Sequence, residues 1–206
     1  MAEPARHTYD QYATHQPVLY TALRRTGGPV IEFGCGDGST PLLHRYCEAR
    51  QRELVTLDTD EGWLNKYAGY ESEFHRLLHV KDWAVILSDD HIVDRRYAVA
   101  FVDQSPWAAR HLTIQAIKYT ARFIVLHDCD YFPEHGLFGK SLAVLNGPTD
   151  RGERTYDDVF KYWREYFPLQ PWPYPRTGPP TLLGSNFEPC NWEIDFRQYV
   201  TEEHFV

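Results

Sequence analysis

The chain has 206 residues, of which 43% are hydrophobic and 15% aromatic, so it is long enough for one domain with a substantial core. Its 29 acidic and 21 basic residues give a formal net charge of −8 at pH 7. Because phosphate backbones are bound by clustered Lys and Arg, this charge argues against nucleic acid as a partner.

Hydropathy and cysteine usage bear on location. There is no run of 18 apolar residues, which argues against a membrane-spanning helix, and the first residues lack the apolar stretch of a secretory signal. The cysteines Cys35, Cys47, Cys129 and Cys190 are scattered, with no CxxC pair. We expect reduced, mostly buried thiols and a cytoplasmic protein without membrane association. A homodimer is compatible with the sequence.

The N-terminal segment, residues 1–28, is predicted to be a helical cap. Residues 1–15 are polar and expected at the surface. Residues 17–25 carry apolar side chains at helical spacing and start with Pro17, which suits a first helical turn. Gly27 and Gly28 then end this helix.

Residues 29–127 alternate between predicted strands and helices. We expect strands at 30–33, 54–58, 77–80, 97–103 and 123–126, and helices after residue 40, at 61–67 and at 107–119. Ser39 or Thr40 can cap the first of these helices, with Pro41 in its first turn. The strands are continuous apolar runs, which is typical of a parallel sheet covered by helices on both faces.

The pattern changes after residue 128. Residues 129–153 lack periodicity and are expected to be an active-site loop, and 155–167 are expected to be an aromatic-rich helix, so 128–167 would be the acceptor-site segment. Residues 168–206 would hold the closing strands and the tail, with one strand at 181–184.

A glycine loop, Gly34-Cys35-Gly36-Asp37-Gly38, follows the first predicted strand, which carries Glu32. Its G-x-G-x-G spacing differs from the dinucleotide G-x-G-x-x-G, and it lacks the lysine of a P-loop. Such a loop allows close approach of a ligand, or it is simply a tight turn.

Acidic residues end or follow the next strands. Asp58 could accept from both hydroxyls of a ribose, or it could cap the helix that follows. Asp82 and Trp83 could border an adenine, although Trp83 is also suited to ordinary core packing. Asp103 ends the fourth strand, at the expected switch point of the sheet.

These motifs together resemble the class I S-adenosylmethionine-dependent methyltransferases of small-molecule type. VIEFGCGDGST resembles their first motif, LVTLDTD their ribose-binding acid, YAVAFVD their fourth-strand motif and FIVLHD the end of their fifth strand. The resemblance covers about residues 17–127. It implies a single α/β domain with a Rossmann-like, mostly parallel, seven-stranded sheet, closed by an antiparallel hairpin near 167–186.

The resemblance also implies that S-adenosylmethionine is the cofactor. The glycines would pass beneath its methionine part, and Glu32 would steady the loop and the amino group. Asp58 would hold the ribose, and Asp103 would lie near the sulfonium. The candidate cofactor-binding residues are Glu32, Gly34, Cys35, Gly36, Gly38, Ser39, Asp58, Thr59, Asp82, Trp83 and Asp103.

His127 and Asp128 follow the fifth strand, beside the expected place of a methyl acceptor. His127 is the candidate general base and Asp128 its partner, or His127 is merely a hydrogen-bonded histidine at a strand end. Asp103, Asp128 and Asp130 could instead bind Mg²⁺. Among small-molecule O-methyltransferases that bind Mg²⁺ through acids at the ends of the fourth and fifth strands, a second acid more often stands at the position of His127. We therefore expect no metal.

The acceptor is expected to be a small molecule, methylated at an oxygen. Its pocket would be lined by aromatic and imidazole side chains, namely Tyr131, Phe132, His135, Phe138 and Phe160, with Gly136 and Gly139 as hinges. Three alternatives remain. The same fold could transfer an aminocarboxypropyl group or cyclise the cofactor, it could bind the cofactor without catalysis, or it could methylate nucleic acid.

Overall fold

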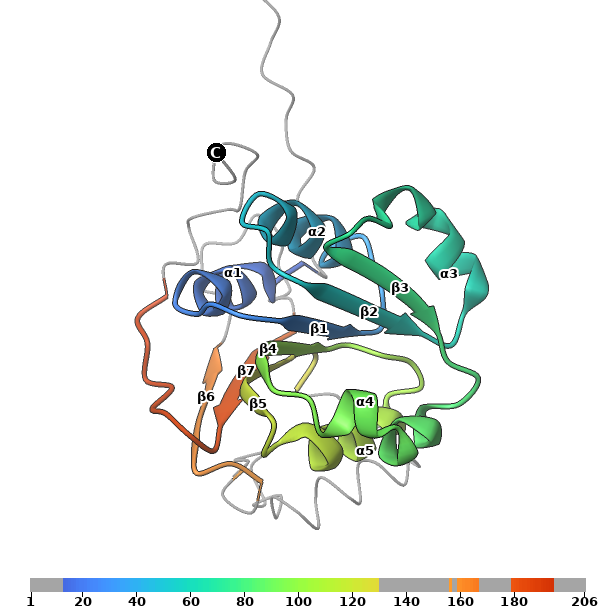
Figure 1. The fold of residues 1–206 in the computed structure, drawn as a ribbon. Coiled ribbons are helices and arrows are strands. Elements are labelled where there is room, and N and C mark those ends of the chain that lie inside the picture. Colours follow the sequence, from blue (N-terminus) through green and yellow to red (C-terminus); the bar gives the residue numbers. More distant parts are fainter. Residues whose placement is uncertain (1–12, 130–155, 157–158, 167–178, 195–206) are drawn as a thin grey trace, which may run out of the picture.

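The computed structural model describes residues 13–129, 156, 159–166 and 179–194. In this part of the chain, seven strands form one sheet in the order β3-β2-β1-β4-β5-β7-β6 (Figure 1). The strands are β1 Val30–Phe33, β2 Leu54–Asp58, β3 His75–His79, β4 Tyr97–Val102, β5 Ala121–Leu126, β6 Tyr162–Tyr166 and β7 Thr181–Ser185.

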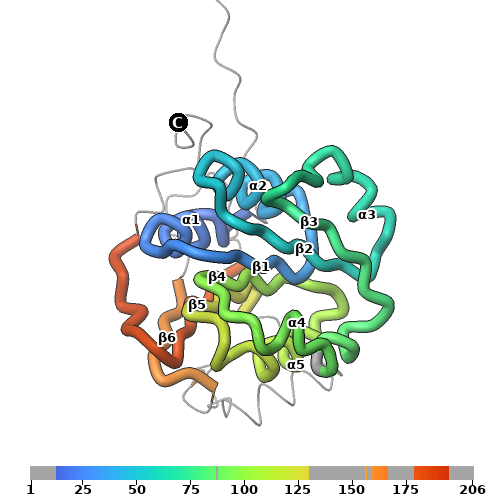
Figure 2. The backbone as a smooth tube through the Cα atoms, viewed as in Figure 1, coloured from blue at the N-terminus to red at the C-terminus, as the bar shows by residue number. Residues whose placement is uncertain are grey.

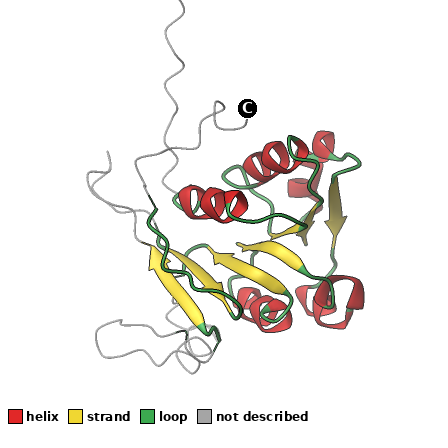
Figure 3. Ribbon diagram, turned by 60° about the vertical axis from the view of Figure 1, so that its left-hand side comes forward, coloured by secondary structure: helices red, strands yellow, loops and turns green. Residues whose placement is uncertain are grey.

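Helices cover both faces of this sheet (Figures 1 and 3). They are α1 Gln16–Arg24, α2 Thr40–Glu48, α3 Glu61–Lys66, α4 Asp90–Val93 and α5 Ala108–Ile117, with 3₁₀ turns η1 Ala68–Tyr70 and η2 Trp83–Ser88. α1, α2 and α3 lie on one side, and α4 and α5 on the other (Figure 1). The predicted Rossmann-like fold, mostly parallel and seven-stranded, is confirmed.

Successive side chains of the strands point to opposite faces of the sheet and contribute to two hydrophobic cores, one on each face. Val30 of β1 packs with the α1 and α2 side chains, whereas Ile31 and Phe33 pack with those of α5 and η2. Every residue of β1 and β4 is buried, as expected for strands covered on both faces. The buried strands therefore hold the carboxyl ends of β1, β2, β4 and β5 rigidly at one edge.

The predicted helix at 155–167 is wrong, because residues 162–166 form strand β6. Tyr162 and Tyr166 pack on the α1 side and Trp163 on the opposite side, which is the alternation of a strand. β6 pairs antiparallel with β7, and β7 pairs antiparallel with β5. The predicted closing hairpin is therefore present, but its first strand begins earlier than residue 167.

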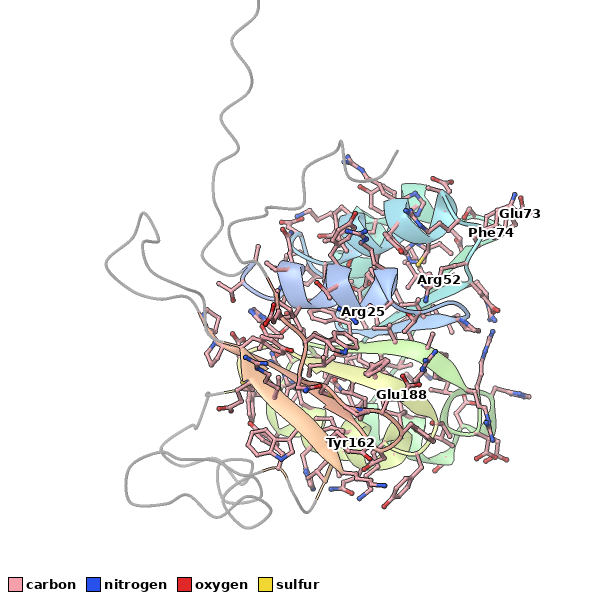
Figure 4. All side chains as sticks on the ribbon, turned by 90° about the vertical axis from the view of Figure 1, so that its left-hand side faces the viewer. Arg25, Arg52, Glu73, Phe74, Tyr162 and Glu188 are labelled. Carbon is pink, nitrogen blue, oxygen red and sulfur yellow. The ribbon has the colours of Figure 1, made fainter. Side chains whose placement is uncertain are left out.

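The opposite edge of the sheet holds the amino ends of the parallel strands (Figure 4). There Arg52 donates to the carbonyl oxygens of Gly28 and Leu23, each at 2.9 Å, and so ties the α1–β1 turn to the chain entering β2. A hollow of about 560 Å³ lies beside it, lined by residues 26–29 and 50–53. The candidate catalytic and cofactor-binding residues predicted from the sequence lie at the carboxyl edge of the sheet, so we do not place the site in this hollow.

Two general expectations can also be compared with the structure. None of the four cysteines forms a disulfide, and Cys47, Cys129 and Cys190 are buried. Among the described helices, none combines the length and the apolar character that crossing a membrane requires.

Candidate functional site

The candidate site lies where β1 is flanked by β2 on one side and β4 on the other. The chain runs from α1 into β1, moves out to β2 and β3, and returns to β4 on the other side of β1 (Figure 2). Connections therefore leave the carboxyl ends of β1 and β4 in opposite directions, which opens a crevice between them. The glycine loop, Asp58, Asp103 and His127 all meet at this edge.

The three glycines of the loop have different surroundings. Gly34 has a φ of +89°, and a Cβ there would lie 2.6 Å from the Cα of Gln104. A Cβ on Gly38 would lie 3.0 Å from Cε1 of His15, whereas one on Gly36 would have no heavy atom within 4 Å. Gly34 thus permits backbone packing against the β4 end, and Gly36 leaves an open cradle.

Glu32 anchors the loop from below. Its carboxylate is fully buried and accepts hydrogen bonds from Ser39 Oγ at 2.6 Å, Thr56 Oγ1 at 2.7 Å and Thr40 Oγ1 at 3.1 Å. Burial raises the pKa of Glu32 to about 7, although these hydroxyls favour the ionised form. Ser39 is the residue before α2 as predicted, but its hydroxyl binds Glu32 and makes no capping bond to the helix.

Asp58 lies at the end of β2 beside the loop. Its Oδ2 accepts from the backbone N–H of Cys35 at 2.8 Å and lies 3.3 Å from the Cys35 thiol. Burial and this carboxylate raise the pKa of the Cys35 thiol, which is therefore neutral at pH 7. The helix cap considered for Asp58 belongs to Asp60, which accepts from the N–H groups of Gly62 and Trp63.

The remaining candidate cofactor-binding residues, Asp82, Trp83 and Thr59, differ in their exposure to solvent. Asp82 is exposed and caps η2 by accepting from the Ala84 N–H at 2.9 Å. Trp83 is buried in the core, and its indole N–H donates to the Ser105 carbonyl at 2.7 Å. Thr59 is half-buried after β2. The role of Asp82 and Trp83 at adenine, and that of Thr59 in cofactor binding, remain predictions.

Asp103 and His127 form the centre of a polar cluster in which His127 is buried and Asp103 is half-buried. Oδ2 of Asp103 lies 3.1 Å from Nδ1 of His127, and its Oδ1 lies 2.7 Å from the Arg110 guanidinium. Burial raises the pKa of Asp103, but His127 and Arg110 more than offset this effect and hold that pKa below its usual range. Asp103 is therefore a carboxylate at neutral pH.

Asp128 completes this cluster on the other side of the imidazole. Its Oδ1 lies 3.5 Å from Nε2 of His127, and its Oδ2 lies 3.6 Å from Arg110. Asp128 has a φ of +49°, which is uncommon for a residue other than glycine. Arg110 also donates to the His127 carbonyl at 2.7 Å, so it holds the β4 and β5 ends together.

Residues 14–16 also contribute to the site, although the sequence analysis did not predict this. Thr14 and His15 are buried, so the surface location expected for them is wrong. Thr14 Oγ1 lies 3.4 Å from Nε2 of His127 and donates to the Pro179 carbonyl at 2.6 Å. The His15 ring packs edge-on against His127, at 4.4 Å between centroids. Gln16 donates to the Gly38 carbonyl at 2.7 Å.

Only the tertiary structure brings this N-terminal strap, residues 14–16, to the carboxyl edge. A polar segment before a helix can be a tail on the surface or a segment that covers a site, and the sequence pattern is the same in both cases. The sequence feature that could have indicated a role for this segment is the run of hydroxyl, imidazole and amide side chains in Thr14-His15-Gln16 directly before Pro17.

A metal could be considered at His15, Asp103 and His127, whose ligand atoms all lie within 4.8 Å of one another. Arg110 already supplies a positive charge at 2.7 Å from Asp103. The His127–Asp103 distance is also that of a hydrogen bond. We therefore assign no metal, and Asp130 lies outside the described residues.

Most of the predicted acceptor pocket also lies outside the described residues, namely Tyr131, Phe132, His135, Phe138 and both hinge glycines. Phe160 is described and is a core residue, so its assignment to the pocket wall is wrong. A Cβ on Gly184 would lie 2.6 Å from the Phe160 ring, because this ring packs directly on the β7 backbone.

Comparisons by sequence find no match: no family model matches the chain. No curated protein matches it either. The fold, however, is similar to several solved structures.

An rRNA methylase from Streptococcus thermophilus superposes with a TM-score of 0.52 at 12% identity, covering 89% of this chain and 100% of that one. A Klebsiella pneumoniae protein described as an O-methyltransferase gives 0.52 at 15% identity over 89% and 83%. Human methyltransferase-like protein 13, in complex with S-adenosylhomocysteine, gives 0.50 at 15% over 87% and 82%. The chain therefore has the fold of the class I S-adenosylmethionine-dependent methyltransferases.

Proposed function

We propose that the protein is an S-adenosylmethionine-dependent methyltransferase that acts on an oxygen of a small molecule. The observation that carries this proposal is the hydrogen-bonded pair of half-buried Asp103 and buried His127, which stands beside the glycine loop at the carboxyl edge of a methyltransferase-type sheet. The likeness in fold to known methyltransferases supports the reaction class.

The residues at this edge fit the cofactor. The open space over Gly36 is a cradle that any larger side chain would fill. The loop would hold the methionine part, Asp58 the ribose hydroxyls, and Asp82 with Trp83 the adenine. When bound, S-adenosylmethionine supplies a methyl group on a cationic sulfur, which is already a good electrophile.

The chain's own contribution is to orient the acceptor, to exclude water and to remove a proton. With its Nδ1–H on Asp103, His127 would accept the acceptor's hydroxyl proton at Nε2. Thr14 Oγ1 lies 3.4 Å from this nitrogen and donates its own proton to the Pro179 carbonyl, so its oxygen could accept from Nε2–H once His127 has taken the proton. Asp128 would favour the imidazolium that forms, because its Oδ1 lies 3.5 Å from Nε2.

The test is calorimetric titration of the protein with S-adenosylmethionine, followed by analysis of the nucleoside formed with a panel of phenols, alcohols and thiols. Binding with conversion to S-adenosylhomocysteine is the expected result. Asp94→Ala is a matched control for variants of Asp58, because Asp94 is an exposed acid directly after α4. Absence of binding would overturn the proposal.

The same measurement separates the alternatives. Methylthioadenosine as product would indicate aminocarboxypropyl transfer or cofactor cyclisation. Binding without any product over the whole panel would indicate a non-catalytic module. RNA belongs in the panel because one similar structure is an rRNA methylase, although a net charge of −8 counts against a nucleic-acid acceptor.

A further inference from the structure

A row of buried polar side chains crosses the sheet beneath α2. It begins at Glu32 on β1, passes through Thr56 on β2 and His75 on β3, and ends at His44 on α2. The exposed fractions of these four residues are 0%, 0%, 1% and 9%. Such groups are costly to bury unless they bond to one another, so their arrangement requires an explanation.

The distances make the row continuous. Thr56 Oγ1 lies 2.7 Å from Oε2 of Glu32 and 2.9 Å from Nε2 of His75. Nδ1 of His75 lies 3.2 Å from Nδ1 of His44. Nε2 of His44 then lies 3.5 Å from Oε2 of Glu48, whose side chain is 54% exposed. The row therefore connects the carboxyl group beneath the glycine loop to solvent.

The protons can be arranged along this row when Glu32 is ionised. Thr56 donates to Glu32, so its oxygen accepts from His75 Nε2–H. Nδ1 of a neutral His75 then has no proton and accepts from His44 Nδ1–H. Nε2 of His44 carries a lone pair on the Glu48 side.

A second arrangement follows when one proton enters at Nε2 of His44. His44 passes its Nδ1 proton to His75, His75 passes its Nε2 proton to Thr56, and Thr56 passes its hydroxyl proton to Glu32. One proton is gained at the solvent end and one O–H bond is formed on Glu32, so the transfer balances. Both imidazoles are neutral before and after, and each has changed tautomer.

The electrostatics agree with this geometry. Burial lowers the pKa of His75 to about 4 and holds that of His44 below its usual value, so both rings are neutral at pH 7. Burial also raises the pKa of Glu32 to about 7, so both of its forms are populated near neutral pH. The row can therefore exist in either arrangement under ordinary conditions.

Other titratable groups face the two ends of the row. Asp103 acts on Glu32 from the end of β4 and favours its protonated form. Cys35, Cys47 and Tyr67 also face Glu32, and each has its own pKa raised, so they are neutral at pH 7.

At the other end, Arg45 and Glu48 act on His44 from its own helix with opposite signs. The Tyr70 ring stacks on the His44 ring at 4.2 Å between centroids. Nε2 of His44 lies 3.5 Å from the largely exposed Glu48 carboxylate, which suits proton exchange with solvent.

We propose that Thr56, His75 and His44 relay a proton between Glu32 and solvent at Glu48, so that binding of a cationic ligand at the glycine loop releases that proton. Glu32 holds Thr40, whose hydroxyl accepts from the Gly36 N–H at 2.9 Å, so its charge acts directly on the loop. The ligand part rests on the proposed use of S-adenosylmethionine, whose sulfonium and ammonium groups favour an ionised Glu32.

The relay itself is tested without any ligand, by ¹⁵N NMR of the histidine ring nitrogens from pH 5 to pH 9. His44 and His75 are expected to exchange tautomers together, with a single midpoint. Glu32→Gln should abolish the exchange, because an amide does not ionise in this range, and Thr56→Val should uncouple the rings from Glu32. His91→Gln is the control, because His91 is exposed on α4. Separate midpoints, or an unchanged exchange in both variants, would overturn the relay.

The coupling to the ligand is tested by titrating S-adenosylmethionine calorimetrically at pH 7 in buffers with different ionisation heats. The wild-type protein should release more protons per ligand bound than Glu32→Gln, by up to one proton. The cofactor's own amine contributes equally to both proteins and cancels. Equal counts would overturn the coupling. Absence of binding would overturn the ligand part together with the proposed function, while the NMR result would still decide the relay.

Discussion

Nδ1 of His127 lies 3.1 Å from Oδ2 of Asp103, and the two residues come from the ends of neighbouring strands. A carboxylate in this position fixes the orientation of the imidazole and the tautomer that it adopts. Arg110 binds the other oxygen of Asp103, so the carboxylate stays ionised at neutral pH. This relationship supports the proposal that His127 acts as a general base.

His127→Ala is expected to lower turnover by about 10²–10⁴-fold, because the acceptor would lose its base. Affinity for S-adenosylmethionine should change little, since His127 is assigned to the acceptor side. Turnover and calorimetric affinity would be measured on the same preparation, with His91→Ala as the control. Full activity in His127→Ala would leave this residue with a structural role.

Asp58→Ala is expected to weaken S-adenosylmethionine binding by more than about tenfold. The variant loses the expected ribose contact and also the bond that holds the Cys35 N–H at 2.8 Å. Calorimetry on Asp58→Ala beside the exposed-acid control Asp94→Ala would check this. If both variants bound the cofactor like the wild type, Asp58 would not belong to the site.

Substitutions of two glycines should separate stability from binding. Gly34→Ala is expected to cost about 2–4 kcal/mol of unfolding free energy, because its φ is +89° and the new Cβ would meet the Gln104 backbone. Gly36→Ala should leave stability nearly unchanged but weaken cofactor binding, because its Cβ would enter the open cradle. Urea unfolding and calorimetry would measure the two effects.

Gly69→Ala serves as the control for both variants, since a Cβ there also meets no heavy atom within 4 Å and the residue lies outside the loop. Unchanged cofactor binding in Gly36→Ala would show that the cradle is not used.

Stability should depend on pH through Asp103. Its pKa in the folded protein is below the usual range, so its stabilising contribution is complete above the ordinary carboxyl pKa of about 4. That contribution is lost as the pH falls through the lower, folded-state value. Asp103→Asn should therefore show a weaker loss of unfolding free energy between pH 5 and pH 2 than wild type. Equal acid dependence in urea unfolding would refute this role of Asp103.

The half of the fold from β1 to β5 could be predicted from the sequence, because the relevant signals are local. Continuous apolar runs predict buried parallel strands, and Gly34 and Gly36 directly after such a run predict the loop. Asp58 and Asp103 were predicted at one edge because the carboxyl ends of parallel strands meet there. The strand at 162–166 was missed, since an aromatic-rich segment is compatible with a helix until its antiparallel partner β7 is known.

Contacts between polar side chains that are distant in the sequence could not be predicted in this way. Thr14 and His15 cover His127 from more than a hundred residues away in the sequence, and His44 meets His75 across the gap between α2 and β3. No periodicity encodes such contacts, because they depend on how a helix or a strap packs on the sheet. The polar networks of Glu32 and Asp103 are therefore properties of the folded chain, although every residue in them is visible in the sequence.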